Sequence, residues 1–175
     1  MSDRRDRFEA LALPHLDAAY NLARWLSRSP SDAEDIVQDA MLRAFKAFDQ
    51  LRGDDARPWL MRIVRNCWRD WATRPHERHD VPLPGGGKGP QLAYDGPDAE
   101  AQAVRASEGR RVRAMVAALP DAFREVLILR EMEDLSYREI AEVTGTPIGT
   151  VMSRLARARG LLKDQWEAED QHGLR

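Results

Sequence analysis

Apolar residues return along the chain at intervals of three and four positions, with polar residues between them. This spacing gathers apolar side chains on one face of a helix, whereas a strand would alternate them every second residue. In the first 74 residues the pattern predicts three helices: one over about 5–27, one opening at Ser31 and one beginning near Pro58. Pro14 is expected to kink the first helix or to split off its first turns.

The same helical period continues in the second half of the chain, over about 98–118 and from 121 to near 133. A closely specified pair of helices follows. Ser136 and Glu139 have the spacing of a capping box, and Gly145 suits a left-handed C-terminal cap. Thr146 is expected to cap the next helix, with Pro147 at its first position. Two short helices joined by a glycine-containing turn are the signature of a helix-turn-helix. An all-α fold is therefore predicted.

Between the two halves, the stretch 75–97 concentrates five prolines and five glycines. Such a composition favours a flexible linker. Its GGGKG run has neither the spacing of a phosphate-binding loop nor a hydroxyl residue after the lysine. We therefore expect two small helical domains joined by a Pro/Gly-rich linker: 1–75, linker 76–97, 98–168, and a tail over 169–175.

Two helices of the first domain have distinctive polar faces. In the second helix three acids share one face, which suits a solvated surface or a protein partner with a basic surface: Asp32, Asp35 and Asp39. In the third helix the inward set is Leu60, Ile63, Val64, Cys67, Trp68 and Trp71, which turns Trp59, Arg62, Asn66 and Arg69 outward. Aromatic and arginine side chains stack on single-stranded bases. The alternatives are that the arginines of this helix, Arg62, Arg65 and Arg69, are merely solvated and that Trp59 is buried against the first helix.

The last helix combines an apolar face with a basic outer face. Val151, Leu155, Ala158 and Leu162 are expected to face the core. Gly149, Ser153, Ala156 and Arg157 then lie opposite, flanked by Thr150, Met152, Arg154 and Arg159. No acid occurs from Thr146 to Lys163. Small residues, arginines and no carboxylates suit a helix that enters the major groove of DNA, although a solvated basic helix would look similar.

Composition removes several classes of function. The 175 residues carry a formal net charge of −2, one cysteine and four scattered histidines. These exclude an internal disulfide and offer no metal-ligand spacing. No apolar run approaches the roughly 20 residues of a membrane span, and MSDRRDRFEAL is charged where a signal peptide is apolar. We expect a cytoplasmic protein that is not an enzyme and has no cofactor, since no nucleophile–base pair is evident.

Three segments together resemble the extracytoplasmic-function sigma factors, bacterial transcription initiation factors of the sigma-70 family. They read DAEDIVQDAMLRAF at 32–45, FDQLRGDDARPWLMRIVRNCWRDW at 48–71 and ALPDAFREVLILREMEDLSYREIAEVTGTPIGTVMSRLARAR at 118–159. The resemblance implies a region 2 domain and a region 4 domain. It implies as partners core RNA polymerase, promoter DNA and an anti-sigma factor.

The resemblance also implies roles for individual residues. Docking on the clamp coiled coil of polymerase would use Asp32, Asp35, Gln38, Asp39 and Arg43. Capture and melting of the minus-ten element would use Arg52, Asp54, Asp55, Arg57, Trp59, Arg62, Asn66 and Arg69. Readout of the minus-thirty-five element would use Thr150, Met152, Ser153, Arg154, Ala156, Arg157 and Arg159. Many relatives carry a basic residue at the position of Met152 and a larger one at Ala156. The acids of the loop GDDARPW could bond cytosine amino groups or keep the loop open.

Three other functions remain as alternatives. A stand-alone helix-turn-helix regulator would bind palindromic half-sites as a dimer. A sigma-like titrator of an anti-sigma factor would have lost its DNA-facing residues, yet Arg157 and Arg159 are present. An enzyme is the weakest alternative.

Overall fold

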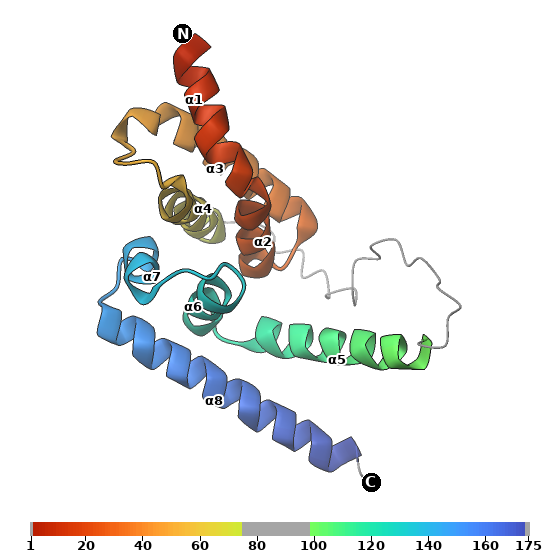
Figure 1. The fold of residues 1–175 in the computed structure, drawn as a ribbon. Coiled ribbons are helices and arrows are strands. Elements are labelled where there is room, and N and C mark those ends of the chain that lie inside the picture. The colour runs from red at the N-terminus through yellow and green to blue at the C-terminus, as the bar shows by residue number, and fades with distance from the viewer. Residues whose placement is uncertain (1, 75–98, 174–175) are drawn as a thin grey trace.

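The computed structural model describes residues 2–74 and 99–173, and the predicted linker lies outside them. The described residues form helices joined by short turns, without a strand, which confirms the all-α prediction. The N-terminal half (residues 2–74) is a bundle of α2, α3 and α4 with α1 extending from its top (Figure 1). The helices are α1 (Ser2–Ala12), α2 (Leu16–Ser27), α3 (Pro30–Lys46) and α4 (Ala56–Ala72).

The expected break at Pro14 is confirmed. Pro14 lies in the 3-10 turn η1 (Leu13–His15), which separates α1 from α2. A second 3-10 turn, η2 (Phe48–Gln50), follows α3. It turns Phe48 into the core, where the Phe8 and Phe48 rings meet edge to face with centroids 5.3 Å apart. The aromatic side chains thus fix the end of α3 against α1.

The first turns of α3 and α4 differ from the prediction by one or two residues. Ser29, rather than Ser31, caps α3: its hydroxyl accepts a hydrogen bond from the Asp32 backbone N–H at 3.4 Å, and Pro30 takes the first helical position. Proline suits that position because its fixed φ is helical and it lacks an N–H to satisfy. Asp55 caps α4 by accepting from the Arg57 N–H at 3.1 Å.

The C-terminal half (residues 99–173) contains α5 (Ala99–Ala118), α6 (Asp121–Glu131), α7 (Tyr137–Thr144) and α8 (Ile148–Gly173). The capping box of α7 is confirmed in both directions: Ser136 Oγ accepts from Glu139 N, and Glu139 Oε2 accepts from Ser136 N. The Ser136 side chain lowers the pKa of Glu139 because it bonds the charged carboxylate. Gly145 ends α7 in the left-handed region at φ 64°.

Helix α8 begins at Ile148, one residue later than predicted. The Pro147 carbonyl accepts from the Thr150 and Val151 N–H groups, and the Thr146 hydroxyl lies 2.8 Å from that of Thr144. At its far end α8 is held to α5 by Arg111. This side chain stacks 4.0 Å above the Trp166 ring and bonds Glu169 and Asp170.

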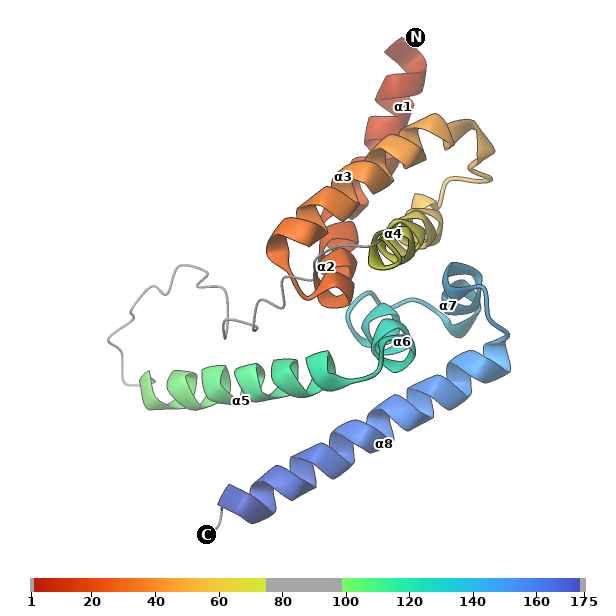
Figure 2. The same cartoon turned by 180° about the vertical axis from the view of Figure 1, so that it is seen from behind.

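The two halves share one continuous hydrophobic core. Helix α7 lies against α4, and α6 lies against α2, as both cartoon views show (Figures 1 and 2). The sequence pattern predicted two domains but not this contact. The arrangement places the helix-turn-helix of α7 and α8 directly beneath the N-terminal bundle.

Replacing Gly145 tests the geometry of the helix-turn-helix turn. Nothing lies within 4 Å of a Cβ added at Gly145, so Gly145→Ala has only a backbone cost, expected to be about 1–2 kcal/mol of unfolding free energy. Gly160 within α8 has equally open space, and Gly160→Ala should instead stabilise by up to about 1 kcal/mol. Urea denaturation followed by circular dichroism measures both. Equal stability of the two variants would contradict the required left-handed turn.

Candidate nucleic-acid interface

The outward face of α8 is built as the sequence predicts. Val151, Leu155 and Ala158 are buried, and Leu162 packs partly buried against the core. Four residues on the opposite side are exposed, and we call them the α8 outer face: Gly149, Ser153, Ala156 and Arg157. Arg157 makes no hydrogen bond or ion pair with any residue in the described part of the chain. Its guanidinium is therefore available to a ligand.

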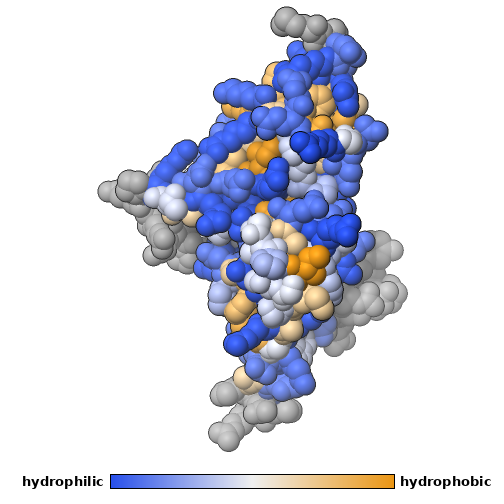
Figure 3. Space-filling view, turned by 90° about the vertical axis from the view of Figure 1, so that its left-hand side faces the viewer, coloured by the Kyte–Doolittle hydropathy of each residue, from blue (hydrophilic) through white to orange (hydrophobic). Residues whose placement is uncertain are grey.

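The residues flanking this outer face are less uniform. Met152 is 53% exposed, whereas Thr150 and Arg154 are half-buried. Arg159 donates to Glu131 of α6 at 2.6 Å, an exposed pair that raises the pKa of Arg159. Ser153 donates to the Thr150 carbonyl at 3.0 Å. The side of the molecule where α8 begins is mostly hydrophilic, with a less hydrophilic area near its middle (Figure 3).

Helix α4 presents a second polar face. Arg62, Asn66 and Arg69 are exposed as predicted, and Trp59 beside them is half-buried. The Trp59 ring packs on Phe48 of η2, with centroids 6.5 Å apart. We call Trp59, Arg62, Asn66 and Arg69 the α4 open face. It combines a half-buried aromatic ring with two arginines and an amide.

The loop before α4 is exposed at Arg52, Asp54 and Asp55. Asp55 is already used as the cap of α4, which gives this acid a local structural role. Gly53 takes a positive φ of 80°, which turns the chain between η2 and α4. The Arg57 side chain is directed toward the C-terminal half rather than the loop, since its Nη2 donates to Glu133 at 3.2 Å.

The predicted polymerase-docking residues lie on one side of α3, which we call the α3 acidic face. Asp35 and Gln38 are exposed, and Asp32, Asp39 and Arg43 are half-buried. Arg43 bridges two acids, Asp70 of α4 at 2.6 Å and Asp39 at 2.8 Å. These bonds, first that to Asp70 and then that to Asp39, raise the pKa of Arg43. They also join the α3 acidic face to α4.

One residue of the α3 acidic face escaped the sequence reasoning. Leu42 is 58% exposed, although apolar residues of α3 such as Ile36 and Ala40 are buried. A helical step of about 100° puts Leu42 between Asp35 and Gln38 on the outer side of α3. The sequence could have indicated this residue, because Leu42 is an apolar residue that lies outside the buried apolar stripe of α3.

A fourth cluster joins the two halves through charges. On α4, Arg57, Met61 and Arg65 follow each other at four-residue spacing and form a stripe that we call the covered stripe. Arg65 is only 9% exposed and donates through Nε to Glu125 of α6. The sequence reasoning grouped Arg65 with solvated arginines, and this was wrong because a helical period carries no information about a second domain.

Glu125 is a buried carboxylate among several arginines. Burial raises its pKa, because it penalises the charged form. The positive charges of Arg65, Arg154 and Arg69 oppose this effect. Glu125 is therefore the point at which α4, α6 and α8 meet electrostatically.

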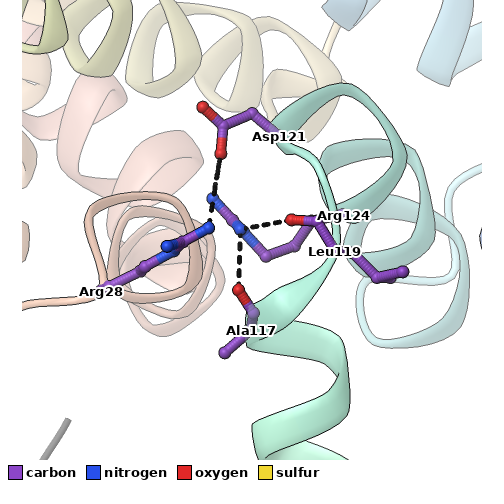
Figure 4. Close-up of polar contacts among 5 residues, drawn as sticks. All are labelled: Arg28, Ala117, Leu119, Asp121 and Arg124. Carbon is purple, nitrogen blue, oxygen red and sulfur yellow. Dashed lines mark hydrogen bonds and ion pairs between the residues drawn. The ribbon is translucent and has the colours of Figure 1, made fainter. Parts of the chain in front are cut away.

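The turn between α5 and α6 carries a further contact to α2 (Figure 4). Arg124 is 1% exposed, and its Nη1 donates to the carbonyls of Ala117 at 3.1 Å and Leu119 at 2.8 Å. Its Nη2 bonds Asp121 at 2.5 Å, and Arg28 approaches the same carboxylate at 3.8 Å. Burial lowers the pKa of Arg124. The buried guanidinium thus fixes the turn that presents Asp121 to α2.

Comparison with known proteins identifies the family of this chain. The family model described as sigma-70 region 2 matches residues 11–78, and that described as sigma-70 region 4 matches residues 109–162. The ECF RNA polymerase sigma-E factor of Haemophilus influenzae is 33% identical over 160 residues, covering 82% of this chain and 78% of that protein. This chain belongs to the extracytoplasmic-function sigma factors of the sigma-70 family.

Other relatives of this sigma factor agree. The ECF RNA polymerase sigma factor SigE of Mycolicibacterium smegmatis is 31% identical over 157 residues, covering 90% of this chain and 60% of that longer protein. The solved structure of CnrH in complex with the cytosolic domain of CnrY is similar at a TM-score of 0.64 and 27% identity. That match covers 92% of this chain and 88% of the other.

Over 2–74 and 99–173, none of the helices has the length and apolar character needed to cross a membrane. Within the same ranges, His, Cys, Asp and Glu side chains form no group of three that could hold a metal ion.

The packing beneath the α3 acidic face can be tested through Cys67. This thiol is 2% exposed, and burial raises its pKa to about 11, from an ordinary value of 9.0. At pH 8 its thiolate fraction should be about 100-fold lower than that of an unperturbed thiol, and the thiolate is the reactive form. Reaction with dithionitrobenzoate should be at least about 100-fold slower in the folded chain than in urea. Similar rates would contradict the burial.

Proposed function

We propose that this sigma factor binds core RNA polymerase in the cytoplasm and directs promoter-specific initiation through three surfaces. The α3 acidic face docks on polymerase, the α8 outer face and its flanks read the minus-thirty-five element, and the α4 open face holds the melted minus-ten element. The observation that carries the proposal is the exposed, acid-free face of α8 on a correctly capped helix-turn-helix.

Readout of the upstream element rests on chemistry and access. A helix enters the major groove when its outer residues are small and its charged residues are cationic. Gly149, Ser153 and Ala156 allow close approach, and Arg157 can fork onto guanine O6 and N7. Arg154 and Arg159 lie toward the groove walls, where phosphate contacts fix the register. Met152 would contribute an apolar contact, such as one to a thymine methyl group, in place of a basic side chain.

Capture of the downstream element rests on the α4 open face. Trp59 is anchored on Phe48 and keeps one part of its surface exposed, which suits stacking with an extruded base. Arg62 and Arg69 supply charge for the backbone of the single strand, and Asn66 can bond base edges. Among the loop residues, Asp54 and Arg52 are free of the capping role held by Asp55 and remain candidates for base contacts. Stacking of an extruded base offsets the few kcal/mol of unstacking.

Docking on polymerase rests on complementary charge around an apolar centre. Asp35 and Gln38 flank Leu42 on the exposed side of α3. A basic surface such as the polymerase clamp coiled coil would neutralise the acids, and Leu42 would supply buried apolar area. Binding energy in such interfaces concentrates in a few central residues. Arg43 holds the face in place through Asp39 and Asp70.

Attachment to polymerase makes two weak DNA contacts specific. Once one domain is bound, contact by the other is intramolecular and gains an effective concentration. The proposed mechanism requires no catalytic residue. An anti-sigma factor is the proposed regulator, as the resemblance to the family implies. The similar CnrH was solved in complex with another protein, the cytosolic domain of CnrY.

Run-off transcription with bacterial core polymerase and a promoter library tests the function and Arg157 together. The chain should initiate from a subset of templates. Arg157→Ala should weaken use of the upstream element by about 1–3 kcal/mol while polymerase binding is unchanged. Arg110→Ala, which alters an exposed arginine of α5, is the matched control. If the purified chain initiates on no template, even after removal of a co-purifying partner, the proposed function is wrong. Loss of polymerase binding by Arg157→Ala would mean that its face is misassigned.

A substitution at Leu42 tests the docking surface. Leu42→Ala should reduce affinity for core polymerase about tenfold, since truncation of a residue at the centre of an interface can cost more than 1 kcal/mol. Val112→Ala changes a similarly exposed apolar residue of α5 and should leave affinity unchanged. Fluorescence anisotropy with labelled sigma factor measures both, and circular dichroism verifies their folding. Equal affinities of the two variants would remove Leu42 from the interface.

A further inference from the structure

Helix α1 lies against the turn that carries the proposed stacking site. Phe8 of α1 packs edge to face on Phe45 and Phe48, with ring centroids 5.2 and 5.3 Å apart. Phe48 is also the ring on which Trp59 of the α4 open face packs, at 6.5 Å. Aromatic contacts therefore connect α1 with the residue proposed to stack on an extruded base. None of the three proposed surfaces includes a residue of α1, and this helix lies almost wholly before the segment that matches sigma-70 region 2.

Two arginines of α1 border these rings, and the first of them has a structural role. Arg4 is half-buried, its Nε donates to Asp49 of η2 at 3.1 Å, and its Nη2 donates to the Phe45 carbonyl at 2.8 Å. Its guanidinium also lies 4.8 Å from the centre of the Phe45 ring. Arg4 therefore holds η2 against α1 and neutralises the acid of that turn.

The second arginine, Arg7, lies about one helical turn further along α1 and is exposed. Its guanidinium lies 5.8 Å from the centre of the Phe48 ring. Arg7 makes no hydrogen bond or ion pair with any residue in 2–74 or 99–173, so its N–H donors are available to a ligand. Because the Phe48 ring contacts both groups, the Arg7 guanidinium is at most about 12 Å from the centre of the Trp59 ring.

The position of Arg7 complements the cations of the α4 open face. Arg62 and Arg69 follow Trp59 along α4, whereas Arg7 approaches Trp59 from the side of Phe48. Proteins that bind single strands combine stacking rings with cations along the path of the backbone. Arg7 supplies a cation at the end of the α4 open face where Arg62 and Arg69 do not lie.

The charges near this end also favour an available cation. The turn η2 and the loop after it carry three exposed acids, which would repel the phosphates of a nucleic acid: Asp49, Asp54 and Asp55. Asp49 is paired with Arg4, and Asp55 accepts from the Arg57 backbone N–H as the cap of α4. The charge of Arg7 is not used in either interaction. It can therefore act on a phosphate.

We propose that Arg7 of α1 is a further nucleic-acid contact of this sigma factor, which binds a phosphate of the melted single strand beside the base stacked on Trp59. This proposal rests on the proposed function. Arg4 is a positioning residue in this arrangement, because it holds η2, and with it Phe48, next to Arg7.

The salt dependence of promoter binding tests this contact, because each phosphate contact releases counterions. Holoenzyme made from core polymerase and the whole chain is bound to a fork template, a duplex promoter whose minus-ten strand is single-stranded. The promoter is one that the unchanged chain uses. Each contact with a single strand contributes about −0.7 to the slope of log K against log salt concentration. Arg7→Gln should therefore make the slope shallower by about 0.7, whereas Arg7→Lys keeps the charge and should keep the slope.

Arg5→Gln is the matched control, since it removes the same charge from the same helix. Arg5 is exposed, bonds Glu9 at 2.7 Å and lies about 160° around α1 from Arg7. Its variant should have the slope of the unchanged chain. On a second template without the single-stranded extension, Arg7→Gln should also have that slope, because the contact is with the melted strand. Circular dichroism and polymerase affinity verify that each variant folds and forms holoenzyme.

The outcomes separate this proposal from the proposed function. If Arg7→Gln weakens binding without changing the slope, Arg7 acts only through Phe48, and the phosphate contact is wrong. An unchanged affinity and slope, an equal change of slope in Arg5→Gln, or a change that persists on the second template would also overturn it. If holoenzyme with the unchanged chain binds the fork template no better than core polymerase alone, the proposed function fails, and the Arg7 contact fails with it.

Discussion

The arrangement of this sigma factor depends on a buried carboxylate and a buried guanidinium that meet between α4 and α6. Glu125 and Arg65 are both nearly inaccessible, and neither charge could stay in that position without the other. Their pairing holds the C-terminal half against one side of α4.

Helix α4 illustrates how one segment meets three demands. One side carries the apolar residues of the N-terminal core, including Leu60 and Val64. A second side is the covered stripe, and the third is the α4 open face with Arg62, Asn66 and Arg69. A helix of 17 residues has room for three faces only because four-residue and three-residue spacings place successive members of each face above one another. Any change on one face is therefore close to the other two.

Sequence reasoning succeeded where the determining interactions are local. Ser136 and Glu139 are three residues apart and satisfy each other's backbone partners, so their pattern specified the start of α7 without knowledge of the rest of the chain. Gly145 ended that helix for an equally local reason. The burial of Val151, Leu155 and Ala158 followed from period alone, and it fixed which side of α8 faces outward. The start of α3 was less determined, because two serines flank Pro30, and the geometry of proline selected Ser29.

Features that depend on contacts between distant segments could not be predicted from the sequence. The helical period placed Arg65 beside solvent-facing arginines, yet α6 covers it with a carboxylate 60 residues away along the chain. Leu42 is the opposite case, an apolar residue that stays exposed. Its role can be judged only together with the residues that surround it on the surface of α3.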